Sequence, residues 1–254
     1  MQEFSLRKKT LLETSHLISY WDFQEEAGRD RVACGAYPYK LKEMGGPIER
    51  VTDRVGEKYG VRMVPGKWFM IPRAQCPALD IHGPQAQLTL LAWIKREPKT
   101  VQTGECQAVA GLWDESRRKR QYCLFIDLQI HNSKDQAGGH VSSIGGPTPG
   151  HPYCMDAAIG KTPINLDQWH YLAFTYDGEY ARVYLNGNLD SRDSFNPYLY
   201  KGGLFDAGPE GADFTVGAVD RSGEMGNWYT GLLGGLALFN RALPESEIRR
   251  AGKI

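Results

Sequence analysis

Residues 169–191, WHYLAFTYDGEYARVYLNGNLDS, decide the fold class of this chain. Three runs rich in aromatic and β-branched residues are separated by Asp177-Gly178 and Asn186-Gly187. Both dipeptides accept the positive φ angles of tight hairpin turns, so the stretch predicts a three-stranded antiparallel meander.

Further runs of strand-forming residues lie on both sides of the meander. The chain has 29 Gly and 14 Pro together with 13 Tyr, 9 Phe and 6 Trp, a mixture typical of many short strands joined by turns. The additional strands are predicted at about 17–23, 61–64, 68–71, 88–95, 107–113, 121–130, 139–144, 214–218 and 231–239. This number of strands fits an all-β fold of two packed antiparallel sheets.

One helix is predicted, in ALPESEIRRAG at 242–252. Pro244 suits the first helical turn, and Glu245 and Glu247 suit the positive end of the helix dipole. Basic residues precede Gly252, which would end the helix. The fold class is therefore all-β with one short C-terminal helix.

The composition excludes several classes of protein. The chain of 254 residues has 30 Lys+Arg and 30 Asp+Glu, so its formal net charge is zero, whereas nucleic-acid-binding proteins normally carry a basic excess. The run RRKR at 117–120 is interpreted as a solvated hairpin tip. The densest apolar runs, at 88–94 and 231–239, are shorter than the roughly 18–20 residues of a membrane-spanning helix. We expect one domain over 1–254, with neither nucleic acid nor a membrane as partner.

The N-terminus and the cysteines bear on the compartment. No continuous apolar segment of a secretion signal follows the first basic residues, so the chain as written is expected in the cytoplasm. A native leader missing from this sequence would instead make the protein secreted. The cysteines are odd in number, far apart and without a CxxC pair, which predicts free thiols. The five are Cys34, Cys76, Cys106, Cys123 and Cys154.

Six fragments in order resemble the laminin G-like domains of the concanavalin A-like lectin/glucanase superfamily. They are LISYWDFQEEAGRD at 17–30, LTLLAWIKRE at 88–97, DQWHYLAFTYDG at 167–178, ARVYLNGNL at 181–189, FTVGA at 214–218 and GLLGGLALFNRALPESEI at 231–248. The resemblance implies a two-sheet antiparallel jelly-roll sandwich. That sandwich hosts sugar-binding modules, protein-adhesion modules, glycoside hydrolases and polysaccharide lyases, so the fold alone does not assign a function.

The resemblance also implies a structural calcium site, which this sequence only partly retains. Many relatives place an acidic residue in the last strand, where this chain has Gly234 and Gly235. Relatives often carry an Asp soon after the Gly that matches Gly28, where this chain has Val32. Oxygen ligands that a hard cation could use remain at Asp22, Glu25, Glu26 and Asp30. We expect that no cofactor is required and that calcium contributes little.

Period-2 alternation assigns the side chains of each strand to two faces. In RQYCLFIDLQIH at 120–131, one face is apolar and the other includes Gln121, Asp127 and His131. In the meander, Arg182 and Tyr184 belong to the outward set. Such a face suits a sugar, because hydroxyl groups need paired donors and acceptors and a pyranose ring needs an apolar platform. We predict that these residues bind a glycan; the alternative is that they are ordinary solvated strand residues.

The segment 144–160, rich in Gly and Pro, is predicted to be a long ordered loop. His140, His151 and Tyr153 lie in or beside it, and one interpretation has them closing one end of the sugar-binding groove. The alternative is that the loop packs under its own aromatic side chains. Trp113, at a strand end, could stack on a sugar or fill the core.

Carbohydrate recognition is the predicted function, with a polysaccharide-processing enzyme as the alternative. The sequence lacks HExxH, G-x-S-x-G, a phosphate loop and the E-x-D-x-x-E pattern of some glucanases with this fold. A lyase or an atypical hydrolase stays open, because Gln121, His131, His140, Arg182 and Tyr184 could together bind a uronate and move protons. A protein-adhesion module is the third possibility.

Overall fold

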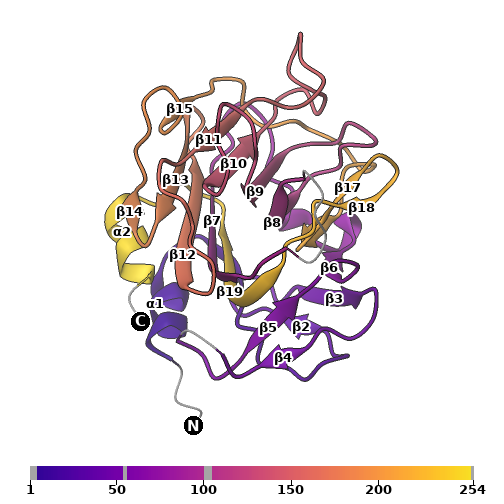
Figure 1. Ribbon diagram of the computed structural model, residues 1–254, viewed down its shortest axis with the longest axis vertical. Helices are drawn as coiled ribbons and strands as arrows, with labels where there is room; N and C mark the ends of the chain where they lie inside the picture. The colour runs from indigo at the N-terminus through magenta and orange to yellow at the C-terminus, as the bar shows by residue number, and fades with distance from the viewer. Residues whose placement is uncertain (1–4, 54–55, 100–104, 253–254) are drawn as a thin grey trace.

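Two antiparallel β-sheets packed face to face form the framework of this chain, as a computed structural model shows (Figure 1). The structure describes residues 5–53, 56–99 and 105–252. Every pairing between named strands in the described residues is antiparallel, which confirms the predicted two-sheet jelly-roll sandwich.

The first sheet has nine strands and is built around the predicted meander. Its order is β14 (Asn188–Leu189), β13 (Tyr180–Leu185), β12 (Trp169–Tyr176), β7 (Leu88–Arg96), β19 (Gly231–Phe239), β5 (Gly60–Met63) and β4 (Arg50–Val51). Two further strands pair off this path, β1 (Leu17–Trp21) with β19 and β15 (Tyr198–Leu199) with β13. The sheet therefore joins N-terminal and C-terminal strands side by side.

The second sheet has eight strands and carries the candidate site. Its order is β11 (Ala157–Ile159), β10 (Ala137–Val141), β9 (Tyr122–Ile126), β8 (Gln107–Leu112), β16 (Phe214–Val216), β6 (Trp68–Ile71), β3 (Lys40–Met44) and β2 (Arg31–Val32). A separate hairpin consists of β17 (Val219–Arg221) and β18 (Glu224–Gly226). Two short 3₁₀ turns, η1 (Arg73–Gln75) and η2 (Pro77–Leu79), follow β6.

Most predicted elements are present, and the differences have local causes. The C-terminal helix is confirmed as α2 (Glu245–Ala251), with Pro244 at its N-cap and Gly252 at its C-cap. The strand predicted over 121–130 ends at Ile126, because several of the following residues adopt the left-handed region. The predicted loop at 144–160 is confirmed up to β11, which occupies its last residues.

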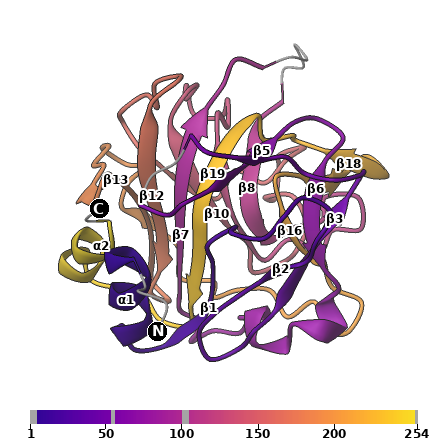
Figure 2. The same ribbon diagram turned by 90° about the horizontal axis from the view of Figure 1, so that it is seen from below.

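Strand β7 shows why LTLLAWI is apolar on both faces. Leu90, Ala92 and Ile94 lie in the core between the sheets, whereas Leu91 and Trp93 lie in a second buried cluster on the outer face of the nine-stranded sheet. Figure 2 shows α2 and a second helix, α1 (Leu6–Glu13), lying over that outer face. Both faces of this sheet are therefore covered over the middle strands.

Helix α1 was not predicted, because its sequence has no apolar stripe. A buried arginine attaches it to the sheet: Arg7 is 1% exposed, and its guanidinium lies 4.4 Å from the Trp93 ring centroid. Arg7 Nη2 donates to the Gly234 carbonyl at 2.6 Å, and Arg7 Nε lies 3.5 Å from a carboxylate oxygen of Glu57. Gly234 lies where the register of β19 shifts against β7, which turns its carbonyl toward the helix.

Two further features of the described residues concern the cysteines and the length of the helices. All five cysteines are free thiols, as the sequence predicts. Over residues 5–53, 56–99 and 105–252, no helix combines the length and the apolar character needed to cross a bilayer.

Candidate functional site

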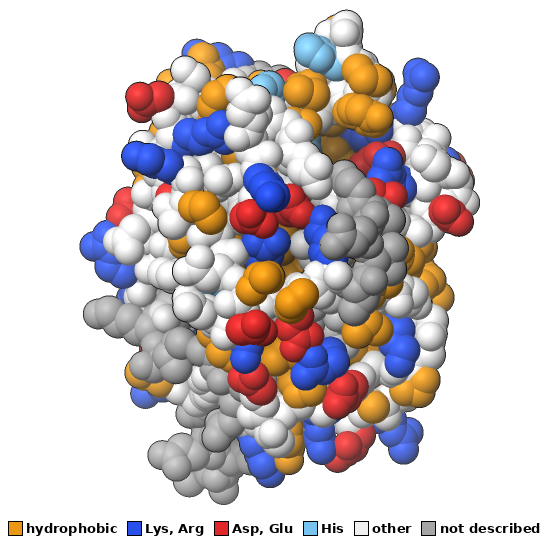
Figure 3. Space-filling model, in the orientation of Figure 1, with side chains coloured by type: hydrophobic (Ala, Val, Ile, Leu, Met, Phe, Trp, Pro, Cys, Tyr) orange, Lys and Arg blue, Asp and Glu red, His pale blue; other side chains and the backbone are white. Residues whose placement is uncertain are grey.

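A pocket of about 600 Å³ lies on the outer face of the eight-stranded sheet, on the side of the sandwich away from α1 and α2. This volume falls in the range of small-molecule binding sites, roughly 300–1,000 Å³. The pocket is lined from the ends of β8 and β9, from β10, from the loop 144–160 and from the β17–β18 hairpin. Figure 3 shows histidine and hydrophobic side chains together at the top of the view.

The floor of the pocket is aromatic and tightly packed. Trp113 and Phe125 meet edge to face with ring centroids 5.8 Å apart, and the His140 ring lies 5.0 Å from Trp113. Trp113 is 2% exposed, so its ring is packed inside the protein and is not available to stack on a sugar. A Cβ at Gly138 would lie 2.2 Å from Leu128 Cδ1, so the absence of a side chain there lets Leu128 fold back into the pocket lining.

His140 presents a hydrogen-bond acceptor to this pocket. Its Nδ1 lies 3.0 Å from the Asp156 carbonyl oxygen, which can only accept, so Nδ1 carries the proton and Nε2 does not. Burial lowers the pKa of His140 to about 4, with the nearby Arg120 charge acting in the same direction. The ring is therefore neutral at pH 7, and its Nε2 can accept a hydrogen bond from a hydroxyl group.

The turn after β9 carries His131 to the pocket. Its four non-glycine residues with φ between 51° and 59° are Asp127, Gln129, His131 and Asn132. Non-glycine residues rarely adopt this region, and such strain is typical of functional sites. His131 Nε2 donates to the Met155 carbonyl at 3.0 Å, and the His131 ring packs 4.8 Å from that of Phe195. Because of the turn, the alternation expected over 120–131 does not continue past Ile126.

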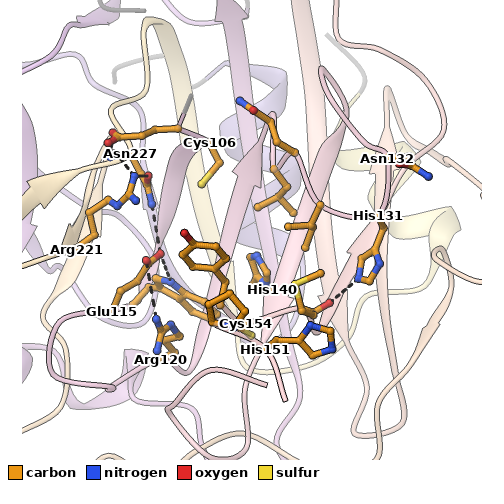
Figure 4. A pocket seen from close by; sticks show the side chains of 18 residues that line it. Cys106, Glu115, Arg120, His131, Asn132, His140, His151, Cys154, Arg221 and Asn227 are labelled. Atoms are coloured by element: carbon orange, nitrogen blue, oxygen red, sulfur yellow. Dashed lines mark hydrogen bonds and ion pairs between the residues drawn. The ribbon is translucent and has the colours of Figure 1, made fainter. Parts of the chain in front are cut away.

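A connected set of polar side chains forms the opposite wall (Figure 4). Glu115 accepts hydrogen bonds from Trp113 Nε1 at 3.2 Å and from Asn227 Nδ2 at 3.3 Å. Arg221 pairs with Glu105 at 2.8 Å and donates to Asn227 Oδ1 at 3.3 Å. Donors and acceptors therefore alternate along this wall.

Arg120 belongs to the same wall, which corrects the interpretation of RRKR as a solvated tip. Arg120 is 5% exposed, donates to the Gly145 carbonyl at 3.3 Å and lies 3.9 Å from Glu115. Its buried Nε has no hydrogen-bond partner in the described part of the chain. Arg117, earlier in the same run, pairs with Asp114 at 2.6 Å. Two of the four basic residues thus make ion pairs or hydrogen bonds within the protein.

The loop 144–160 forms the rim of the pocket. Thr148 Oγ1 donates to Asp156 Oδ2 at 2.6 Å and accepts from the Met155 amide at 2.8 Å, so the loop is fixed at its base. His151 and Tyr153 lie at its tip, and Tyr153 is 57% exposed. The exposed tyrosine favours the binding interpretation over a loop packed under its own aromatic side chains.

Of the six residues predicted to bind a glycan, His131 and His140 line this pocket. Gln121 does not, because it is fully buried: Arg73 donates to its Oε1 at 2.7 Å, and its Nε2 donates to Asp80 at 2.9 Å. Asp127 is 5% exposed, pairs with Lys99 and lines a neighbouring hollow instead.

Arg182 and Tyr184 lie on the other side of the sandwich, which corrects the expectation of one shared face. They belong to β13 of the nine-stranded sheet, whereas His140 belongs to the eight-stranded sheet. Tyr184 is 6% exposed among side chains beneath α2, and Arg182 pairs with Asp177. The five residues proposed for lyase chemistry are thus divided between two faces.

The sequence interpretation missed the polar wall. Glu105, Glu115, Arg221 and Asn227 come from two distant segments and share no local motif. The link between the segments is a bridge between Asp114 and Asp220, which no sequence signal identifies. The composition of a strand end, here Trp113-Asp114-Glu115, was the only available indication.

Of the four acidic residues that could offer oxygen ligands to a cation, Asp22, Glu25, Glu26 and Asp30, the first three are already engaged by the protein. Asp22 pairs with Lys8 at 2.7 Å, Glu25 accepts from the Val32 amide at 2.7 Å, and Glu26 pairs with Arg50 at 2.5 Å. Among the described residues, no group of three or more His, Cys, Asp or Glu side chains could hold a metal ion. The carbonyl of Gly234 accepts from the Arg7 guanidinium, so a protein cation already lies beside the glycines of the last strand.

We therefore predict that calcium has little effect on stability. Millimolar calcium should change the melting temperature by less than about 2 °C relative to chelator, which is under roughly 1 kcal/mol for a chain of this size. Differential scanning calorimetry in the two buffers measures this, with magnesium as the control ion. A larger rise with calcium alone would show that oxygen ligands assemble around it.

Comparisons with known proteins agree with this architecture. A laminin G family model, described as the concanavalin A-like lectin/glucanases superfamily, matches residues 73–249, as the sequence resemblance predicts. No curated protein sequence matches the chain. Residues before 73 still contribute strands to both sheets, including β1 beside β19 and β6 beside β16.

Three solved structures show the shared fold. Domain 4 of an extracellular arabinanase from Geobacillus stearothermophilus, in complex with arabinotriose, has a TM-score of 0.60 and 16% identity over 93% of this chain and 98% of that one. Trypanosoma rangeli sialidase in complex with sialic acid has a TM-score of 0.60 and 16% identity, over 95% of this chain and 33% of that one. The receptor binding domain of botulinum neurotoxin C/D mosaic serotype has a TM-score of 0.58 and 11% identity, over 93% and 51%.

Proposed function

This chain belongs to the concanavalin A-like lectin/glucanases superfamily, and we propose that it binds carbohydrate in the pocket on its eight-stranded sheet. The observation that carries the proposal is an exposed aromatic ring, Tyr153, at the rim of a pocket whose wall alternates donors and acceptors. A sugar needs both features, because its ring faces are apolar and its hydroxyl groups both donate and accept.

The wall of the pocket is arranged for such hydroxyl groups. The carboxylates of Glu105 and Glu115 accept hydrogen bonds, and Arg221 can donate from guanidinium nitrogens that Glu105 does not occupy. Across the pocket, His140 offers its Nε2 as an acceptor (Figure 4). Each of these side chains is already held by the protein, so little conformational freedom is lost when a ligand binds.

The arabinanase domain supports the proposal, because it is a chain of similar length with the same fold and is bound to an oligosaccharide, arabinotriose. Recognition of a glycan without turnover is the proposed activity. The lyase alternative has no comparable support, since its five residues lie on two faces of the sandwich.

The proposal predicts that Tyr153→Ala weakens glycan binding by about tenfold or more, a change of about 1.4 kcal/mol. The reason is that the variant removes the exposed ring that would cover one face of the sugar. A glycan array identifies the ligand, and isothermal titration calorimetry on that ligand measures the change. The assay mixture is also analysed for cleaved product.

Tyr37→Ala is the matched control, because Tyr37 is 45% exposed but lies outside the pocket lining. It should bind like the unmodified protein. Equal affinity of the Tyr153 variant and the unmodified protein would contradict the proposed site. Product release that requires the pocket residues would instead identify an enzyme.

A further inference from the structure

We infer that this pocket selects uncharged saccharides and discriminates against those that carry a carboxylate or sulfate group. The inference rests on the proposed carbohydrate-binding function and names the class of sugar. The evidence for it is the charge of the side chains that line the pocket and whether each of them donates or accepts hydrogen bonds.

The charged side chains of the lining cancel one another. Two are carboxylates, Glu105 and Glu115, and two are guanidiniums, Arg120 and Arg221. Arg221 lies 2.8 Å from Glu105, and Arg120 lies 3.9 Å from Glu115. Each arginine thus has a carboxylate beside it, and an acidic ligand that approached either arginine would also approach a negative charge.

The arginines are engaged by further acceptors of the protein. Arg221 also donates to Asn227 Oδ1 at 3.3 Å, and Arg120 to the Gly145 carbonyl at 3.3 Å. Each guanidinium is therefore held beside a carboxylate, so an acidic ligand that paired with its remaining N–H groups would lie close to a negative charge.

The remaining lining groups favour ligands that donate hydrogen bonds. His140 Nε2 is unprotonated, because Nδ1 holds the proton for the Asp156 carbonyl. His131 Nε2 donates to the Met155 carbonyl at 3.0 Å, so this nitrogen is already used within the protein. Together with the carboxylates of Glu105 and Glu115, His140 Nε2 provides three acceptor groups. A hydroxyl group can donate to them, whereas a carboxylate or sulfate oxygen cannot.

Burial supports this reading, since it lowers the pKa of His140 to about 4 and keeps the ring uncharged at pH 7. His140 therefore offers no positive charge that could pair with the acidic group of a sugar. The same ring accepts from a neutral sugar without any change of protonation.

The test compares matched neutral and acidic oligosaccharides of equal length: gluco-, galacto- and manno-configured chains and their uronate counterparts. The unmodified protein should bind the neutral member of its preferred pair at least about tenfold more tightly. Glu105→Gln/Glu115→Gln keeps the shape of the wall but removes two negative charges. The double variant should lower the ratio of neutral to uronate affinity by about tenfold. The accompanying increase in uronate affinity should be smaller at high salt.

Glu224→Gln is the matched control, because it makes the same charge change at an exposed position of the β17–β18 hairpin outside the lining. It should leave the preference unchanged. Glu105→Gln alone serves as a second variant if the double variant does not fold, as checked by its melting curve. It should narrow the preference in the same direction.

Three outcomes overturn the inference. Tighter binding of the uronate member by the unmodified protein refutes the selectivity while leaving the proposed carbohydrate binding intact. An unchanged preference in folded glutamine variants refutes the role given to Glu105 and Glu115. Failure of the folded, unmodified protein to bind any member of either set contradicts the proposed function, and the inference with it.

Discussion

Replacing Phe174 by Ala should lower the free energy of unfolding by about 3–5 kcal/mol, the usual cost of removing a buried phenylalanine. Phe174 is fully buried on β12, in the core between the two sheets. It points at β10 of the opposite sheet, where a Cβ at Gly139 would lie 2.1 Å from Phe174 Cδ2. The ring therefore fits into the space left by a missing side chain directly beside His140.

This contact predicts a coupling between the two sheets. Gly139→Ala alone should cost about 1–3 kcal/mol, because the added methyl group overpacks the core. In the double variant the methyl group enters space that the phenylalanine has left. The double variant should therefore lose less free energy of unfolding than the sum of the two single losses. Urea denaturation of all four proteins, followed by tryptophan fluorescence, measures this cycle. Additive losses would show that the sheets do not meet at these two residues.

The sequence predicted the strands well because their signals are local. The hairpin dipeptides Asp177-Gly178 and Asn186-Gly187 lie at the turns between β12, β13 and β14, as expected. Helix α2 begins after Pro244 and ends before Gly252 for the same reason. Each of these signals acts through the backbone conformations that a few neighbouring residues allow, so no knowledge of distant contacts is needed.

The candidate site was predicted only in part, because alternation separates inward from outward residues but does not identify the sheet. Arg182 and His140 both point away from the core, yet they lie on opposite sides of the sandwich. A polar side chain in an outward position can also be buried by a loop or turn, as Gln121 is by its contacts with Arg73 and Asp80. Pairing between distant strands decides these outcomes.

Helix α1 and Arg120 illustrate a second limit. In each case a buried guanidinium packs against an aromatic ring. Arg7 of α1 lies 4.4 Å from the Trp93 ring centroid, and Arg120 lies 5.8 Å from that of Trp113. In sequence, an arginine predicts exposure, because burying its charge is costly without partners. The partners here are carbonyls and rings from other elements, so the burial is visible only once the fold is formed.

The buried His140 should make the stability of the protein depend on pH. The pKa of this ring is lowered from 6.5 to about 4 in the folded chain, because burial disfavours the charged form. Between these values the unfolded chain binds a proton that the folded chain does not, so the free energy of unfolding falls as the pH falls. The loss begins as the pH drops through 6.5 and reaches about 3 kcal/mol near pH 4.

Comparison with His140→Gln isolates this contribution, because other groups titrate over the same range. The difference in unfolding free energy between the two proteins should change by up to about 3 kcal/mol from pH 7 to pH 4, to the disadvantage of the histidine. Urea denaturation at closely spaced pH values measures it. His151→Gln, which replaces an exposed histidine at the rim of the same pocket, is the control for the loss of a histidine there. A difference between unmodified protein and His140→Gln that is flat with pH would mean that the pKa of this ring is the same in the folded and unfolded chain, near 6.5. The pocket floor would then carry a positive charge at pH 5, and the acceptor role of Nε2 would be lost there.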